Sequence, residues 1–128
     1  MIYIDSSVVP AHLLVERRSP HEALWDDTLV SSRLLQYEVW NRIHAYGLSP
    51  SHRDEATTLI GRMVLVDLSR LVLGRALEPF PIRVRTLDGL HLATVDFLRT
   101  QGEPVELASY DNRLVAAARV LEIPIAAL

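Results

Sequence analysis

Short apolar segments alternate with longer segments of helical character along this chain, and this alternation constrains the fold more than any other feature. Strands that are separated by helices form βαβ units, in which neighbouring strands run parallel. The apolar segments are nearly continuous, as expected for strands that are covered on both faces. The sequence therefore predicts a three-layer α/β fold with a central parallel sheet. Its predicted strands are Ile2–Ile4, Thr28–Ser31, Met63–Leu68, Val105–Ser109 and a last short one at Ile123–Ala126.

Helices are predicted between these strands from apolar periodicity and from signals at their ends. Gly47 and Gly102 are each expected just after a helix C-terminus, where glycine is common. Pro79 and Pro81 stop another helix, because proline lacks the amide hydrogen that a helix requires. The predicted helices are Ser6–Arg17, a short piece at Trp25, Arg33–Tyr46, Ser49–Arg62, Leu71–Leu77, Thr86–Gln101 and Asn112–Leu121, with Ser19-Pro20 breaking the chain after the first.

The length of 128 residues predicts a single domain over residues 1–128, because it leaves no room for a second core of ordinary size. Apolar residues make up 49% of the chain, which is enough for a hydrophobic core. The absence of cysteine excludes disulfides, thiolate metal sites and cysteine nucleophiles. The first residues reach the carboxylate of Asp5 without a positively charged region, and no apolar run approaches the roughly 18 residues of a membrane helix. We therefore expect a cytoplasmic protein without a signal peptide.

All thirteen basic residues are arginine, and the chain has no lysine. This excludes P-loop and Schiff-base chemistry, which both depend on a lysine. The net charge of −3 argues against a protein that coats duplex nucleic acid without specificity, because such proteins are strongly basic. Chemistry on nucleic acid remains open, since bound divalent cations can supply positive charge locally.

Two aspartates follow predicted strands. Asp5 comes directly after the first strand, and Asp111 lies two residues after Ser109 at the end of the fourth. Ligands of open parallel sheets bind at the carboxyl ends of the strands, so both side chains are expected at the edge where chemistry occurs. Each aspartate alone could simply cap the helix that follows it. Their equivalent positions favour a shared site.

Glu38 falls inside the apolar arc of the predicted helix Arg33–Tyr46, between Leu34 and Leu35. A buried carboxylate must be paired with a cation or bound to a metal. An ion pair with Arg42, one turn later, is the structural alternative. Trp40 projects away from this arc and could either line a partner groove or pack on a neighbouring helix.

Asp88 stands in the first turn of the strongly apolar helix Thr86–Gln101. A carboxylate at this position could merely complement the helix dipole, with Thr86 as the cap. His91 lies in the apolar face of the same helix and is interpreted as a hydrogen-bonded core residue. The functional interpretation places Asp88 in the same acidic pocket as Asp5 and Glu38.

Several carboxylates in one pocket repel each other unless positive charge neutralises them. Mg²⁺ binds oxygen ligands, keeps several waters and is commonly shared between carboxylates and a substrate phosphate. Such an ion can activate water and stabilise the oxygen that leaves phosphorus. The absence of cysteine and of a histidine pair with HExxH spacing argues against zinc.

At these residues the sequence resembles the PIN-domain ribonucleases, in particular the VapC toxins of bacterial toxin–antitoxin pairs. Four stretches carry the resemblance, in order, over nearly the whole chain. They are YIDSS at residues 3–7, which resembles a D-[ST]-S opening; LQYEV at 35–39, which carries the second acidic residue; TLDGLHLAT at 86–94, which resembles T-L-D-A-L-H-L-A-T; and SYDNRL at 109–114, which resembles T-x-D-x-R-L. Gly89 stands where the family usually has alanine.

The resemblance implies a PIN-like fold of about five parallel strands in the order 3-2-1-4-5. It implies endonucleolytic cleavage of RNA that depends on Mg²⁺ or Mn²⁺, a cognate antitoxin that blocks the site, and a homodimer. By the same resemblance Asp5, Glu38 and Asp88 are the main metal-binding residues, and Asp111 completes the site. Ser6 and Ser109 are implied as supporting hydrogen-bond donors.

Arg83, Arg85 and Arg113 lie beside the predicted site and could bind RNA, since guanidinium groups bind phosphates in a bidentate manner. Solvated arginines that have no such role are the alternative. A catalytically silent PIN-like module that binds other proteins is the second hypothesis for the whole chain. A phosphatase or phosphoacceptor domain fits poorly, because Asp5 is followed by two serines and no lysine is present.

Overall fold

A parallel sheet forms the centre of the computed structural model, which describes residues 1–14 and 20–128. The sheet has four strands in the order β3-β2-β1-β4, and each pair is parallel. This confirms the predicted α/β class and the relative order of these strands. The strands are β1 (Ile2–Ile4), β2 (Leu29–Ser32), β3 (Val64–Val66) and β4 (Glu106–Ala108).

The predicted fifth strand, Ile123–Ala126, is wrong as a strand. In its place the chain makes one parallel bridge, between Leu107 and Ile125. Leu107 donates its amide to the carbonyl of Pro124, and Ala126 donates back to Leu107, each at 2.8 Å. Pro124 has no amide hydrogen, so it cannot extend this pairing into a ladder. The segment nevertheless lies beside β4, where the order 3-2-1-4-5 places it.

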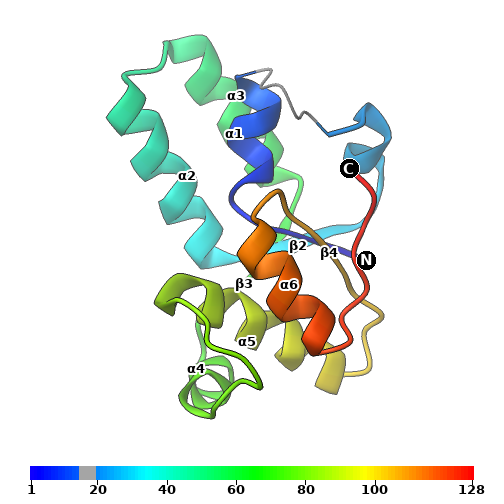
Figure 1. The fold of residues 1–128 in the computed structure, drawn as a ribbon. Helices are drawn as coiled ribbons and strands as arrows, with labels where there is room; N and C mark the ends of the chain where they lie inside the picture. Colours follow the sequence, from blue (N-terminus) through cyan, green and yellow to red (C-terminus); the bar gives the residue numbers. More distant parts are fainter. Residues whose placement is uncertain (15–19) are drawn as a thin grey trace.

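Helices cover both faces of the sheet. In Figure 1, α1, α2 and α3 lie on one side of the strands, and α4, α5 and α6 lie on the other. Gly47 ends α2 in the left-handed conformation with a φ of 59°, as predicted. The helices are α1 (Val8–Leu13), α2 (Arg33–Tyr46), α3 (Pro50–Gly61), α4 (Arg70–Leu77), α5 (Thr86–Thr100) and α6 (Asn112–Val120), with a short 3₁₀ helix, η1, at Glu22–Asp26.

The predicted end of the first helix at Arg17 and the break at Ser19 lie outside the described residues. Within the described ranges, no helix combines the length and the apolar character that a bilayer-spanning segment needs.

The core consists of two hydrophobic layers, one on each face of the sheet. Alternation along β1 assigns Ile2 and Ile4 to the layer beneath α1, α2 and α3, whereas Tyr3 joins the layer beneath α5 and α6. Trp40 packs against the first layer, which agrees with the packing alternative for this residue. In the second layer Leu92 of α5 is fully buried. This packing anchors α5 against the sheet and fixes the position of its N-terminal turn.

Candidate functional site

Asp5 lies at the carboxyl end of β1 and is buried, with 5% of its surface exposed. Its Oδ2 accepts hydrogen bonds from the hydroxyls of Ser7, at 2.7 Å, and Ser109, at 2.9 Å. The Ser7 amide, 3.3 Å away, also points at this oxygen. Asp5 is not the cap of α1, because Ser7 holds the N-cap position. Donors from both ends of the chain therefore fix this carboxylate.

Glu38 extends from α2 toward the same edge of the sheet. Its Oε1 lies 2.6 Å from Nε2 of His91, and its Oε2 accepts a hydrogen bond of 3.1 Å from the Ser6 hydroxyl. His91 is almost fully buried on α5, and its Nδ1 lies 2.7 Å from the hydroxyl of Tyr3. A carboxylate only accepts hydrogen bonds, so Nε2 of His91 carries the proton in this contact. Glu38 is thus tied to the core through a second titratable residue.

Asp88 and Asp111 are joined by one arginine. Arg85 donates through Nε to Asp88 Oδ2 at 3.2 Å and through Nη2 to Asp111 Oδ2 at 2.9 Å. The other oxygen of Asp111 accepts the amides of Arg113 and Leu114, which makes Asp111 the N-cap of α6. The capping alternative is therefore confirmed for Asp111. Its second oxygen faces the acidic site at the same time.

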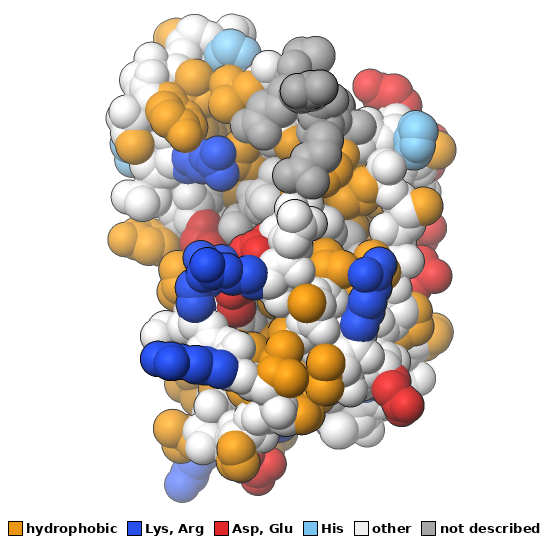
Figure 2. Space-filling view, in the orientation of Figure 1, with side chains coloured by type: hydrophobic (Ala, Val, Ile, Leu, Met, Phe, Trp, Pro, Cys, Tyr) orange, Lys and Arg blue, Asp and Glu red, His pale blue; other side chains and the backbone are white. Residues whose placement is uncertain are grey.

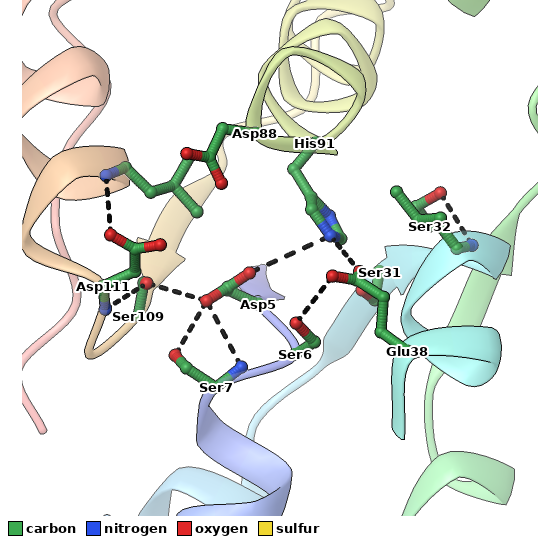
Figure 3. Close-up of polar contacts among 12 residues, drawn as sticks. Asp5, Ser6, Ser7, Ser31, Ser32, Glu38, Asp88, His91, Ser109 and Asp111 are labelled. Atoms are coloured by element: carbon green, nitrogen blue, oxygen red, sulfur yellow. Dashed lines mark hydrogen bonds and ion pairs between the residues drawn. The ribbon is translucent and has the colours of Figure 1, made fainter. Parts of the chain in front are cut away.

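These carboxylates converge on one pocket of about 460 Å³. Figure 3 shows Asp5 between Asp111 and Glu38, with Asp88 at the start of α5 directed toward them. In Figure 2, acidic side chains on this face of the molecule are partly covered by neighbouring basic ones. The structure thus brings together all four predicted acidic residues, and their catalytic role remains a prediction. The pocket is lined by Asp5, Ser6, Ser7, Glu38, Arg42, Arg85, Thr86, Leu87, Asp88 and Asp111.

The electrostatics of this pocket reflect crowded negative charge. Burial raises the pKa of Asp88 above its ordinary value, and the charges of Asp111 and Asp5 raise it further, although Arg85 opposes the shift. The pKa of Arg85 is raised by its contacts with Asp88 and Asp111. Burial by itself lowers the pKa of His91, but the hydrogen bond to Glu38 and the nearby carboxylates outweigh it, so that this pKa is raised. The pocket therefore favours bound positive charge.

The donor set of the pocket suits a hard divalent cation, because it consists of carboxylate and hydroxyl oxygens. Among the described residues, no group of three or more histidine, aspartate or glutamate side chains is already arranged to hold a metal ion. In the same pocket, Arg85 occupies one oxygen of Asp88 and one of Asp111. The chemistry of the donors fits Mg²⁺ or Mn²⁺. Asp88 and Asp111 are positioned by their ion pairs with Arg85.

The remaining predicted residues lie around this pocket. Ser6 and Ser109 each donate to a carboxylate, as described above. Arg83 and Arg113 are exposed and line a neighbouring pocket of about 610 Å³, which Arg85 and Asp88 also line. Arg85 therefore belongs to both pockets. Binding of RNA by these arginines remains a prediction.

Two residues that hold the carboxylates of this pocket in place, Ser7 and His91, were not predicted from the sequence as part of the site. Ser7 binds Asp5, and its place in the Asp5-Ser6-Ser7 stretch was the available signal. His91 is a buried, hydrogen-bonded residue as expected, but its partner Glu38 belongs to the acidic site. The spacing from Asp88 to His91 is one helical turn, which places both on the same face of α5. The suggestion that Thr86 caps α5 is wrong, because Arg85 holds the N-cap position and no side chain caps this helix.

Comparison with known proteins gives full-length similarity to two bacterial ribonucleases. Ribonuclease VapC35 of Mycobacterium tuberculosis, from two strains, is 27% identical over 132 residues, which span 99% of this chain and 96% of the relative. Ribonuclease VapC47 of the same species is 26% identical over 126 residues, which span 93% and 90% of the two chains. No protein-family model matches the chain. The chain is thus similar over nearly its full length to chains named ribonuclease VapC, in agreement with the resemblance that its motifs carry.

Proposed function

We propose that this chain is a cytoplasmic endoribonuclease that depends on Mg²⁺ or Mn²⁺ and serves as the toxin of a toxin–antitoxin pair. The observation that carries the proposal is the convergence of Asp5, Glu38, Asp88 and Asp111 on one pocket at the carboxyl edge of the sheet. The similarity to chains named ribonuclease VapC35 and VapC47 supports the same activity.

The residues of the pocket have different parts in this proposal. Asp5 would be a metal ligand, and hydroxyls of Ser7 and Ser109 hold its carboxylate in place. Glu38 is oriented by His91 and Ser6. When bound, a divalent ion supplies an activated water and neutralises charge at the oxygen that leaves phosphorus. The exposed arginines of the adjacent pocket would hold a neighbouring phosphate of the RNA.

The direct test is cleavage of total cellular RNA by the purified full chain. We expect fragments with Mg²⁺ or Mn²⁺ and none with EDTA. Asp5→Asn should abolish cleavage while the fold is retained, because the amide cannot supply the negative charge of the carboxylate. Asp54→Asn, at an exposed position of α3, is the matched control and should cleave as the unmodified chain does. Undiminished cleavage by Asp5→Asn, or cleavage that survives EDTA, would contradict the proposal.

The partners in this proposal are an RNA substrate, a cognate antitoxin and a second copy of the chain. A small neighbouring gene should encode a protein that copurifies with the chain and suppresses its cleavage of RNA. Light scattering of the purified chain should give the mass of a dimer. Full activity in the presence of that protein would contradict the antitoxin assignment, and a monomeric mass would contradict the dimer.

One observation favours a second candidate, a catalytically silent module that binds other proteins. Arg85 already neutralises Asp88 and Asp111, so the fold holds two of its carboxylates without a metal ion. Calorimetric titration with Mn²⁺ separates the two candidates. Heat that disappears in Asp5→Asn supports the nuclease, whereas the absence of any heat supports the silent module.

A further inference from the structure

Arg85 is the residue that links the acidic pocket to its basic neighbour. It stands at the N-cap position of α5, between the two pockets, and its side chain is 57% exposed. Its guanidinium joins two elements that are distant in the sequence, because it donates to Asp88 on α5 and to Asp111 at the start of α6. The side chain thus places one positive charge among the carboxylates that the proposed function assigns to a metal ion.

We propose that Arg85 is a built-in counter-cation of the acidic pocket, which a divalent ion displaces from Asp88 and Asp111 and which then contacts an RNA phosphate. This inference rests on the proposed function, because it deepens the role of the same site. It assigns Arg85 two alternative partners, the carboxylates in the metal-free protein and the phosphate in the loaded one.

Displacement follows from the use of the carboxylate oxygens. In Asp111, Oδ1 accepts the amides that begin α6, so only Oδ2 can turn to a metal ion, and Arg85 occupies it. In Asp88, Arg85 occupies Oδ2. A cation at these oxygens and the guanidinium would also repel each other at short range. Metal binding and the Arg85 contacts therefore compete for the same oxygen at Asp111, and at both aspartates they compete through the repulsion between the two cations.

The release of Arg85 is favoured by its exposure. The Arg85 side chain is 57% exposed, so water solvates the guanidinium once it leaves the carboxylates, whereas Asp88 and Asp111 are only 14% and 26% exposed and gain a new counter-charge from the ion. The released guanidinium remains beside Arg83 and Arg113, which line the adjacent pocket of about 610 Å³. A phosphodiester group bound there would accept two parallel hydrogen bonds from the guanidinium. The same side chain then opposes metal binding in the free protein and assists RNA binding in the loaded protein.

This double role gives opposite effects on two ligands. Removing Arg85 should tighten the binding of a divalent ion to the free protein, because nothing then competes for the carboxylates. It should weaken the binding of RNA, because a phosphate loses its donor. Replacing a residue that has a merely structural role would weaken the binding of both the divalent ion and the RNA, or of neither. The opposite signs therefore distinguish the inference from a general loss of integrity.

The test is calorimetric titration of the full chain with Mn²⁺, without RNA. Arg85→Gln should bind Mn²⁺ more tightly by about fivefold or more, the lower end of typical coupling between ligands. Arg83→Gln is the matched control, because it removes an exposed arginine of the adjacent pocket that makes no hydrogen bond or ion pair with a described carboxylate. Its Mn²⁺ affinity should equal that of the unmodified chain.

Two further measurements complete the test. In EDTA, Arg85→Gln should unfold at a lower temperature than the unmodified chain, since Asp88 and Asp111 lose their counter-charge, and Mn²⁺ should close this gap. With saturating Mn²⁺, its KM for a short oligoribonucleotide of mixed sequence should rise. Arg85→Lys keeps the charge but not the fork that spans both carboxylates, so its Mn²⁺ affinity should be intermediate.

The outcomes separate the inference from the proposed function. Equal or weaker Mn²⁺ binding by Arg85→Gln, with normal binding by the unmodified chain, would overturn the counter-cation role and leave the nuclease proposal standing. Failure of both proteins to bind Mn²⁺ would overturn the metal site and this inference with it. Tighter Mn²⁺ binding by both Arg85→Gln and Arg83→Gln would show a general charge effect and would also overturn it.

Discussion

His91 Nε2 lies 2.6 Å from Glu38 Oε1, and this contact joins the buried face of α5 to the acidic site. The same imidazole lies 3.9 Å from Asp5 Oδ1 and contacts the Tyr3 hydroxyl through Nδ1. One buried side chain therefore sets the position of Glu38 and adds positive character near Asp5. Groups that hold metal-binding side chains in place commonly affect metal affinity as strongly as some of the ligands do.

Replacement of His91 tests this positioning role. His91→Leu removes the donor to Glu38 and should reduce Mn²⁺ affinity or RNA cleavage by about 10- to 100-fold, as is typical for such supporting residues. His91→Gln keeps a donor near the Nε2 position and should recover much of the loss. Calorimetry with Mn²⁺ and cleavage rates provide the measurements. If His91→Leu and His91→Gln both fold but are equally impaired, the hydrogen bond to Glu38 does not determine Mn²⁺ affinity or RNA cleavage.

The stability of the metal-free protein should depend on pH through His91. Its pKa is raised in the folded state by Glu38 and the neighbouring carboxylates, so the folded protein binds this proton more tightly than the unfolded chain does. The resulting stabilisation is complete below the ordinary histidine pKa of about 6.5 and is lost as the pH rises through the raised value. Denaturant unfolding in EDTA, measured at a series of pH values from 6 upward, should show the decline.

The decline should disappear in His91→Gln, which cannot titrate. His44→Gln, at an exposed position of α2, is the control and should keep the decline. A decline of the same size in His91→Gln would assign the pH dependence to another group.

Asp88→Asn should stabilise the metal-free protein at neutral pH. Burial and the charges of Asp111 and Asp5 raise the pKa of Asp88 despite Arg85, so its ionised form is disfavoured in the folded state. Because the folded protein then binds more protons, stability falls as the pH rises from the ordinary aspartate pKa through the raised one. The gain from asparagine is therefore full above this window and absent below it. Thermal unfolding in EDTA across this range measures the gain.

The same substitution should remove Mn²⁺ binding, so stability and function would change in opposite directions, as is common at functional sites. Asp54→Asn again serves as the control and should shift the melting temperature at neither end of the pH range. An Asp88→Asn protein that melts below the unmodified chain at neutral pH would contradict this account of the pocket.

Much of the fold could be predicted because its determinants are local. Gly47 ends α2 through its own backbone conformation, and Asp5 and Asp111 follow strands that are recognisable as apolar runs. The topological rule for parallel sheets then places both aspartates at one edge. Glu38 could be added because its position in an apolar arc is unusual for a carboxylate.

The rest of the site depends on contacts between distant residues, which periodicity does not encode. Arg85 and Asp111 are far apart in the sequence, and their ion pair exists only because α5 and α6 begin at the same edge of the sheet. The sequence could assign His91 to the core, but it could not show that His91 contacts Glu38 on α2. The fifth strand failed for a local reason instead, since Pro124 cannot donate to a ladder.

Manganese scatters X-rays anomalously, so crystals of the full chain grown with Mn²⁺ would show where the ion binds. We expect an anomalous difference peak inside the pocket of Asp5, Glu38, Asp88 and Asp111, with carboxylate oxygens at about 2.0 to 2.6 Å, the range of hard divalent ions. The guanidinium of Arg85 should have turned away from Asp88 and Asp111. Crystals grown at saturating Mn²⁺ with no peak in this pocket, and with Arg85 still bridging the two aspartates, would show that the four carboxylates do not form a metal site.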